Sequence, residues 1–127
     1  MRYNHESLLT ETKTRRIEPD VTVVEIIGRL NLGNLLLSIE STIRRVIDEG
    51  ARKLVIDVGA LNSLDSSGIG MLVSCAGHMR QSGGQMRIAG AQGTVAKVFA
   101  MVHMHMIVPL DPDVAAASAG FTAQPAG

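Results

Sequence analysis

Residues 53–70 read KLVIDVGALNSLDSSGIG, and this stretch decides the fold. It opens with a short, mostly apolar run, residues 53–58, of the kind that forms a strand buried on both faces. A helical pattern follows and ends at the glycine pair 83–84, so we expect residues 59–64 to form a loop between strand and helix. A strand, a loop and a helix in this order predict one unit of a parallel sheet with helices packed on it. The buried face of the helix is expected to consist of Ile69, Leu72, Val73, Ala76 and Met79.

Two segments before this unit predict an antiparallel hairpin, and a third predicts a helix. Residues 8–17 alternate loosely between apolar and polar side chains, and residues 21–27, VTVVEII, are mostly β-branched. Pro19 and Asp20 between them are typical turn residues. From Asn34 to Gly50, apolar residues recur at three- and four-residue steps, which predicts an amphipathic helix. Its apolar residues are Leu35, Leu36, Ile39, Ile43, Val46 and Ile47.

The remaining pattern predicts two more strands and two more helices. We expect a strand at residues 85–89, a helix at 94–102, a short strand at 106–110 and one or two helical turns after Asp113. The order indicates an α/β fold with a mixed, mostly parallel sheet of 4–5 strands, an antiparallel N-terminal hairpin and four flanking helices. We expect one domain over residues 8–117, with disordered residues at 1–7 and 118–127.

Charge and cysteine content limit the functions open to the chain. Its 127 residues carry twelve basic and twelve acidic side chains, so no net field attracts nucleic acid. Arg44 and Arg45 are expected on the solvated side of the first helix, and His78 has no evident partner. Cys75 is the single cysteine, so it forms no intramolecular disulfide and is expected to be buried. No apolar run has the length of a membrane span or of a signal peptide, so we expect a cytoplasmic protein without direct membrane insertion.

The segment Asp65-Ser66-Ser67-Gly68, at the start of the second helix, is the strongest candidate for a functional site. Asp and Ser are common N-cap residues, and a cap explains one of these side chains. Three polar residues in a row exceed that need, and Gly68 and Gly70 each disfavour a helix interior. A helix N-terminus presents unpaired amides and a partial positive charge. A hydroxyl in the first turn is therefore chemically suited to carry a phosphate.

Four segments of the chain resemble STAS-domain antagonists of anti-sigma factors in their order and spacing. The segments are Gly28-Arg29-Leu30, Val55-Ile56-Asp57 with Leu61, residues 64–70 (LDSSGIG) and Gly83-Gly84-Gln85-Met86. The resemblance covers residues 10–117, and Asp-Ser-Ser-Gly is its most diagnostic part. It implies a STAS fold.

The resemblance implies a binding module that phosphorylation switches, and not an enzyme. In that family an anti-sigma factor, which is also a serine kinase of the histidine-kinase-like ATPase superfamily, phosphorylates the first hydroxyl residue after the Asp. That residue is Ser66 here, and a serine phosphatase reverses the reaction. The unmodified antagonist binds the anti-sigma factor and so releases the sigma factor. By the same resemblance Asp65 positions the segment, Ser67 supports the helix start and Gly68 allows approach of the kinase.

Asn31 departs from the family pattern. Many family members have Asp after Gly-x-Leu, whereas this chain has Asn31, followed by Leu32-Gly33-Asn34. The loop is expected beside the phosphorylation site, so Asn31 is counted among the partner-binding residues. We expect the missing carboxylate to affect which partner is recognised and whether Ser66 is phosphorylated.

Three other functions fit the sequence less well. A STAS adaptor subunit of a membrane ABC transporter or lipid-trafficking complex is the alternative in which Ser66 only caps the helix and contacts the partner. A receiver domain with Asp57 as phosphoacceptor needs further acidic residues and a lysine that the pattern does not supply. A hydrolase elbow requires Gly-x-Ser-x-Gly, and Leu64 stands at the first glycine position.

We expect neither a cofactor nor a metal. His103 and His105 could place two imidazoles on one face of a strand, but two ligands without a third coordinate a metal poorly. The methionines nearby, Met101, Met104 and Met106, are expected to fill gaps in a core that is almost without aromatic residues.

Overall fold

The structure, a computed structural model, describes residues 10–122, so the disorder expected at residues 1–7 and at 123–127 of the C-terminal tail lies outside the described residues. Within these residues, six strands and four α-helices follow one another, with one 3-10 helix before the last strand. In chain order they are β1 (Glu11–Ile17), β2 (Val21–Leu30), α1 (Asn34–Asp48), β3 (Lys53–Asp57), β4 (Leu61–Leu64), α2 (Ser66–Gln81), β5 (Gln85–Ala89), α3 (Gly93–Met101), η2 (Met104–Met106), β6 (Leu110–Asp111) and α4 (Val114–Thr122).

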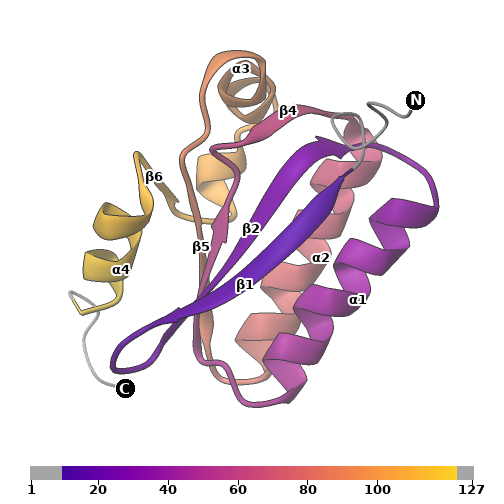
Figure 1. The fold of residues 1–127 in the computed structure, drawn as a ribbon. Coiled ribbons are helices and arrows are strands. Elements are labelled where there is room, and N and C mark those ends of the chain that lie inside the picture. The colour runs from indigo at the N-terminus through magenta and orange to yellow at the C-terminus, as the bar shows by residue number, and fades with distance from the viewer. Residues whose placement is uncertain (1–9, 123–127) are drawn as a thin grey trace, which may run out of the picture.

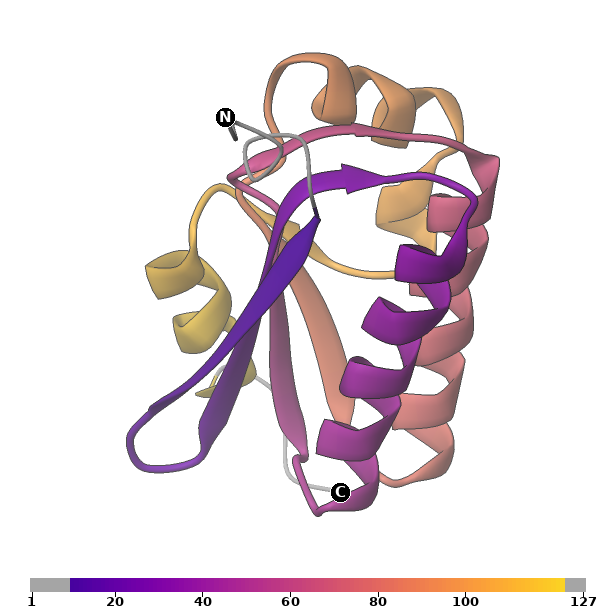
Figure 2. The ribbon, with the colours of Figure 1, turned by 45° about the vertical axis from the view of Figure 1, so that its right-hand side comes forward.

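Five strands form the sheet in the order β1-β2-β3-β5-β6, and β4 pairs with the end of β2. The β1-β2 pair is antiparallel and all the other pairs are parallel. Helices α1 and α2 cover one face of the sheet, α4 covers the other, and α3 lies at the end of the sheet near β4 (Figures 1 and 2). The expected α/β fold, its antiparallel hairpin and its four helices are confirmed, with six strands in place of 4–5.

Two hydrophobic layers form because side chains along a strand alternate between the two faces of the sheet. In β2, Val24 and Ile26 belong to the larger core shared with α1, α2 and α3. Val23, directly before Val24 in the strand, belongs to a smaller core with Ala117 and Phe121 of α4. The chain therefore buries both faces of the central strands.

Helix α4 continues to Thr122, beyond residue 117, where we expected the ordered domain to end. Two contacts of Phe121 explain the difference. Its side chain is buried in the smaller core, and its ring lies 5.7 Å from the guanidinium carbon of Arg87. Arg87 in turn donates two hydrogen bonds to Asp111, at 2.9 and 3.2 Å. Residues 118–122, which we expected to be disordered, are thus part of a helix that Phe121 holds against the smaller core.

Residues 61–64 form strand β4 and not the expected loop. The register between β2 and β4 shifts just after Gly28. The φ of this glycine is +107°, and it redirects the end of β2. Only Leu61 and Leu64 of the four β4 residues are buried, a pattern too short to predict a strand. The consequence is functional, because β4 carries the chain along β2 directly to Asp65.

The prediction of a strand at residues 106–110 is largely wrong. Only Leu110–Asp111 pair with β5, whereas Met104–Met106 form a 3-10 helix. His103 precedes this turn in a left-handed conformation with φ of +55°. Met104 and Val108 are both buried, but Met106, which would share their face in a strand, is exposed. The amide of Val108 donates to the carbonyl oxygen of Met104 at 3.0 Å, which is a helical turn.

Helix α2 buries a slightly different face from the one predicted. Met71 and Cys75 are buried, while Ile69 and Val73 are only partly covered. Cys75 is buried as expected, and its burial raises the pKa of the thiol to about 11. The thiol is therefore protonated and unreactive at neutral pH.

Candidate functional site

Asp65 joins the start of α2 to the loop that follows β2. One carboxylate oxygen, Oδ1, accepts a hydrogen bond from the amide of Gly68 at 3.1 Å, which is an N-cap. The other, Oδ2, accepts one from the amide of Leu32 at 3.0 Å. The amide of Asp65 donates to the carbonyl oxygen of Leu30 at 3.3 Å. A single residue thus fixes the relative positions of two loops that lie far apart in the sequence.

The same hydrogen bonds favour the charged form of Asp65. The amide of Leu32, followed by that of Gly68, lowers the pKa of the Asp65 carboxyl below its ordinary value. The carboxylate is therefore ionised at neutral pH. Its negative charge lies at the N-terminus of α2, where the helix dipole also favours an anion.

Gly68 is required by the packing of α2 against β2. A Cβ atom at this position would overlap the carbonyl oxygen of Leu30 and lie 3.0 Å from the Leu30 Cγ atom. The resemblance assigned Gly68 to approach of a kinase, but the residue is buried and has this internal reason to be glycine. Gly70 differs, because it is exposed and a Cβ there would meet nothing within 4 Å.

Ser66 occupies the first turn of α2 with its side chain exposed. Within residues 10–122, neither the Ser66 nor the Ser67 hydroxyl makes a hydrogen bond, because Asp65 already caps the helix. Ser67 is half-buried, and it supports the helix start only through its backbone amide, which also lowers the pKa of Asp65. Ser66 is therefore the more accessible of the two hydroxyls.

The loop between β2 and α1 lies beside Asp65, as expected for Asn31. Asn31 is exposed and immediately precedes Leu32, whose amide binds Asp65. The side chain of Leu32 is 78% exposed, and that of Leu37 on the first turn of α1 is 66% exposed. The exposure of these leucines could not be predicted from the sequence, because the residue type alone does not say whether a leucine side chain is buried.

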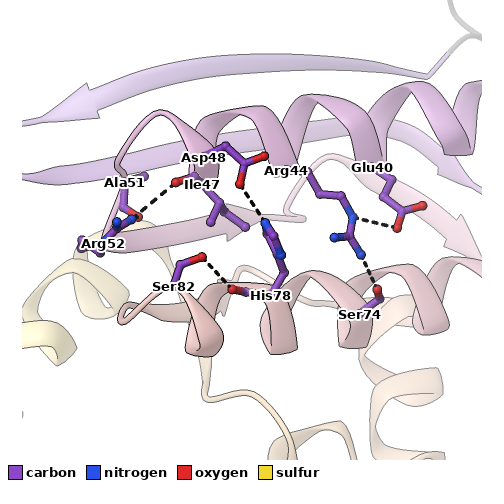
Figure 3. A network of polar contacts seen from close by, with 9 residues as sticks. All are labelled: Glu40, Arg44, Ile47, Asp48, Ala51, Arg52, Ser74, His78 and Ser82. Carbon is purple, nitrogen blue, oxygen red and sulfur yellow. Dashed lines mark hydrogen bonds and ion pairs between the residues drawn. The ribbon is translucent and has the colours of Figure 1, made fainter.

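Helices α1 and α2 are tied side by side by polar contacts (Figure 3). Arg44 donates to Ser74 Oγ at 2.7 Å while its Nε atom contacts Glu40 at 3.2 Å, so Arg44 does not simply face solvent as expected. The Nε2 atom of His78, for which the sequence offered no partner, lies 2.9 Å from Asp48 Oδ1. Both interhelical contacts join residues that are 30 positions apart.

This constant offset describes two parallel helices in a fixed register. Continued by two turns toward the helix N-termini, the register places Leu37 at the level of Ser67. The exposed leucines of the β2-α1 region therefore belong to the same end of the molecule as Ser66. The structure brings Asn31, Asp65, Ser66 and Ser67 together there.

The other candidate residues make different contacts. Asp57 Oδ1 accepts a hydrogen bond from the amide of Gly59 at 2.9 Å, so this carboxylate shapes the turn after β3. The rings of His103 and His105 lie edge to face at 6.0 Å. Among residues 10–122, no three His, Cys, Asp or Glu side chains are grouped so that they could hold a metal ion. None of the helices in that range is long and apolar enough to span a bilayer.

Of the three clustered methionines, only Met104 fills the core as predicted. Met104 is fully buried, whereas Met101 and Met106 are 76% and 77% exposed. The prediction was wrong for these two residues, which end α3 and the 3-10 helix, respectively, with their side chains outside the core.

Comparison with known proteins agrees with this geometry. The family model of the STAS domain matches residues 12–117. The putative anti-sigma factor antagonist BtrV of Bordetella bronchiseptica is 30% identical over 83 residues, which cover 65% of this chain and 72% of BtrV.

Two solved structures share the fold at lower sequence identity. An anti-sigma factor antagonist from Mycobacterium paratuberculosis superimposes with a TM-score of 0.77 at 19% identity, covering 88% of this chain and 93% of that one. The anti-sigma factor antagonist SpoIIAA of Bacillus, in its unphosphorylated form, has a TM-score of 0.74 at 19% identity, with coverage of 91% and 100%.

Proposed function

The chain belongs to the STAS domain family, and we propose that it acts in the cytoplasm as an anti-sigma factor antagonist. In its unmodified form it binds an anti-sigma factor that is also a serine kinase of the histidine-kinase-like ATPase superfamily, and this binding releases a sigma factor. The kinase inactivates the antagonist by phosphorylating Ser66, and a serine phosphatase restores it. The chain itself is a binding protein and supplies no catalytic group.

The observation that carries the proposal is the division of roles between Asp65 and Ser66. Asp65 caps α2 and holds the adjacent loop through hydrogen bonds to Gly68 and Leu32. The Ser66 side chain is therefore not needed to cap the helix, and it is exposed at the helix N-terminus. A kinase can modify this hydroxyl without dismantling the helix cap.

The charge of a phosphate on Ser66 supports loss of binding as the result of modification. The group adds about −1.5 to −2 charges, beside the ionised carboxylate of Asp65. A partner carboxylate about 5 Å away would repel each unit of charge by about 3 kcal/mol at an effective dielectric constant of 20. The helix dipole returns only about 0.3–1 kcal/mol. Repulsion therefore dominates at an interface that fits a neutral hydroxyl.

Phosphate transfer gives the direct test. The protein is incubated with ATP and a candidate anti-sigma kinase from the same genome, and the product is measured by intact mass. Trypsin releases residues 54–80 as one peptide that contains Ser63, Ser66, Ser67 and Ser74, so fragment spectra must locate the phosphate. We expect one phosphate, on Ser66, that disappears in Ser66→Ala and persists in the matched control Ser67→Ala. A phosphate on another serine would overturn the assignment.

Binding of the same kinase tests the switch separately. We expect Ser66→Asp to weaken the complex by about 100-fold, which corresponds to the loss of about 3 kcal/mol. Ser66→Ala removes the acceptor without adding charge and should still bind. Equal binding of wild type and Ser66→Asp, with no phosphate transfer, would favour an unswitched adaptor such as a transporter-associated STAS subunit.

A further inference from the structure

Met101, Val102, Met106 and Ile107 form an exposed apolar surface that the proposed function does not use; we refer to these four residues as the methionine surface. Met101 and Met106 are 76% and 77% exposed, and Val102 and Ile107 are each 40% exposed. Within the described residues, the only other large apolar side chains exposed to this degree are the leucines near Ser66. Concentrated apolar exposure of this kind is typical of interaction sites.

The methionine surface is held in place by the fold. Met104, at the centre of the segment, is fully buried and anchors it to the larger core. The amides of Ile107 and Val108 donate to the carbonyl oxygen of Met104 at 2.8 and 3.0 Å. His103 turns the chain out of α3 in a left-handed conformation, which is uncommon for a residue other than glycine. The exposed side chains are therefore presented by an ordered turn and not by a frayed end.

A hollow adjoins the methionine surface at Ile107. It has a volume of about 200 Å³ and is lined by Ile107 and Pro109 together with Ala76 and Arg80 of α2 and neighbouring residues of β5. Ala76 and Arg80 lie on the side of α2 opposite to Ser74 and His78, because two positions along a helix differ by about 200°. The hollow, with Ile107 at its edge, is thus on the side of α2 that faces away from α1.

The charged side chains of residues 66–110, the segment that contains the methionine surface, are all basic. The chain is neutral as a whole, yet residues 66–110 contain no Asp or Glu, whereas they contain Arg80, Arg87, Lys97 and three histidines. Arg87 is neutralised by Asp111. Lys97 precedes Met101 by one helical turn and lies on the same side of α3, and Arg80 borders the hollow. An apolar strip bordered by cations complements an apolar strip bordered by anions.

We infer that the methionine surface, with Lys97 and Arg80, is a docking site for an acidic amphipathic helix of a partner protein. A helix of this kind places its apolar side chains on the methionines and in the hollow at Ile107, and its carboxylates near the two cations. Unbranched methionine side chains adapt to such a partner. A membrane surface fits less well, because it calls for aromatic anchors and for clusters of about four to eight cations.

The test uses the full chain and a defined probe. The probe is a helix-forming peptide of about 18 residues, with Leu at three- and four-residue steps and Glu at the remaining positions. Chemical shifts of the ¹⁵N-labelled protein are followed during titration. The variant Met101→Glu with Met106→Glu removes the surface, and Ala115→Glu on the exposed side of α4 is the matched control. A peptide with Lys in place of Glu controls for charge.

We expect chemical-shift changes confined to residues 97–109 and to the region of Arg80. Added salt should weaken the binding of the peptide. The double variant should raise the Kd by about tenfold or more, equal to about 1.4 kcal/mol, while Ala115→Glu and the wild type bind alike. Equal binding of the Lys peptide, shifts confined to the Ser66 end, or no shifts at about 1 mM peptide would overturn the inference. So would binding only to vesicles of phosphatidylserine and phosphatidylcholine, or a dimer of this chain that the double variant abolishes. Phosphorylation of Ser66 in the double variant reports separately on the proposed function.

Discussion

The Ser66 end of α2 and the methionine surface are both exposed, but the protein builds them in different ways. At the Ser66 end, one carboxylate and one glycine fix the geometry through hydrogen bonds and close packing with β2. At the methionine surface, one buried side chain, Met104, holds a turn whose neighbours face outward.

This difference explains why the two regions were unequally visible in the sequence. Capping residues and helical glycines have local rules, so their chemistry can be predicted from a few letters. An apolar residue in a turn follows no such rule, because only the surrounding fold decides whether it is covered. Polar sites are thus easier to find by sequence reasoning than apolar ones.

Removing the anchor of the methionine surface should have the largest effect on stability. Met104→Ala leaves a cavity in the larger core, and such a change typically costs about 2–5 kcal/mol. Met106→Ala, two residues away and exposed, should change the free energy of unfolding by less than about 0.5 kcal/mol. Urea unfolding of both variants measures the contrast, and equal losses would show that Met104 is no anchor.

Gly68 and Gly70, two of the three glycines of α2, should respond in opposite directions to substitution by alanine. Gly68→Ala places a methyl group against the Leu30 carbonyl, and overpacking of this kind costs about 1–3 kcal/mol. Gly70→Ala meets open space in a helix and should stabilise the protein by up to about 1 kcal/mol. Thermal unfolding distinguishes the two. A stable Gly68→Ala variant that fails only in kinase binding would instead return Gly68 to a role in partner approach.

Acid should lower the stability of the protein by protonating Asp65, and this effect should be smaller than those of the Met104 and Gly68 substitutions. The folded-state pKa of Asp65 lies below its ordinary value of 3.8. Its stabilisation is therefore complete above that value and is lost as the pH falls through the folded-state pKa. We expect Asp65→Asn to make the stability of the protein depend less on pH below about 4. Identical pH profiles of unfolding for Asp65→Asn and wild type would contradict this account.

Much of the fold could be predicted because its elements have strong local periods. The buried run of β3, the helical periods of α1 and α2 and the hairpin of β1 and β2 each followed a simple pattern. The buried faces of the helices were predicted less well, because α2 buries Met71 and Cys75 more fully than Ile69 and Val73, and Leu35 of α1 is 46% exposed. Strand β4 was missed because four residues with two buried leucines carry little pattern. The strand expected near Met106 was wrong, because two buried residues four positions apart close a turn there.

By itself the sequence determined the layered α/β architecture and the place of the acidic and hydroxyl residues at one helix start. Spacing along the chain encodes both, since helices and strands repeat over a few residues. Only the tertiary structure decided that Asp65 reaches the amide of Leu32, that Gly68 packs against Leu30, and that Met101 and Met106 stay exposed. Those outcomes depend on segments brought together by the sheet and its packed helices, and no local pattern encodes such contacts.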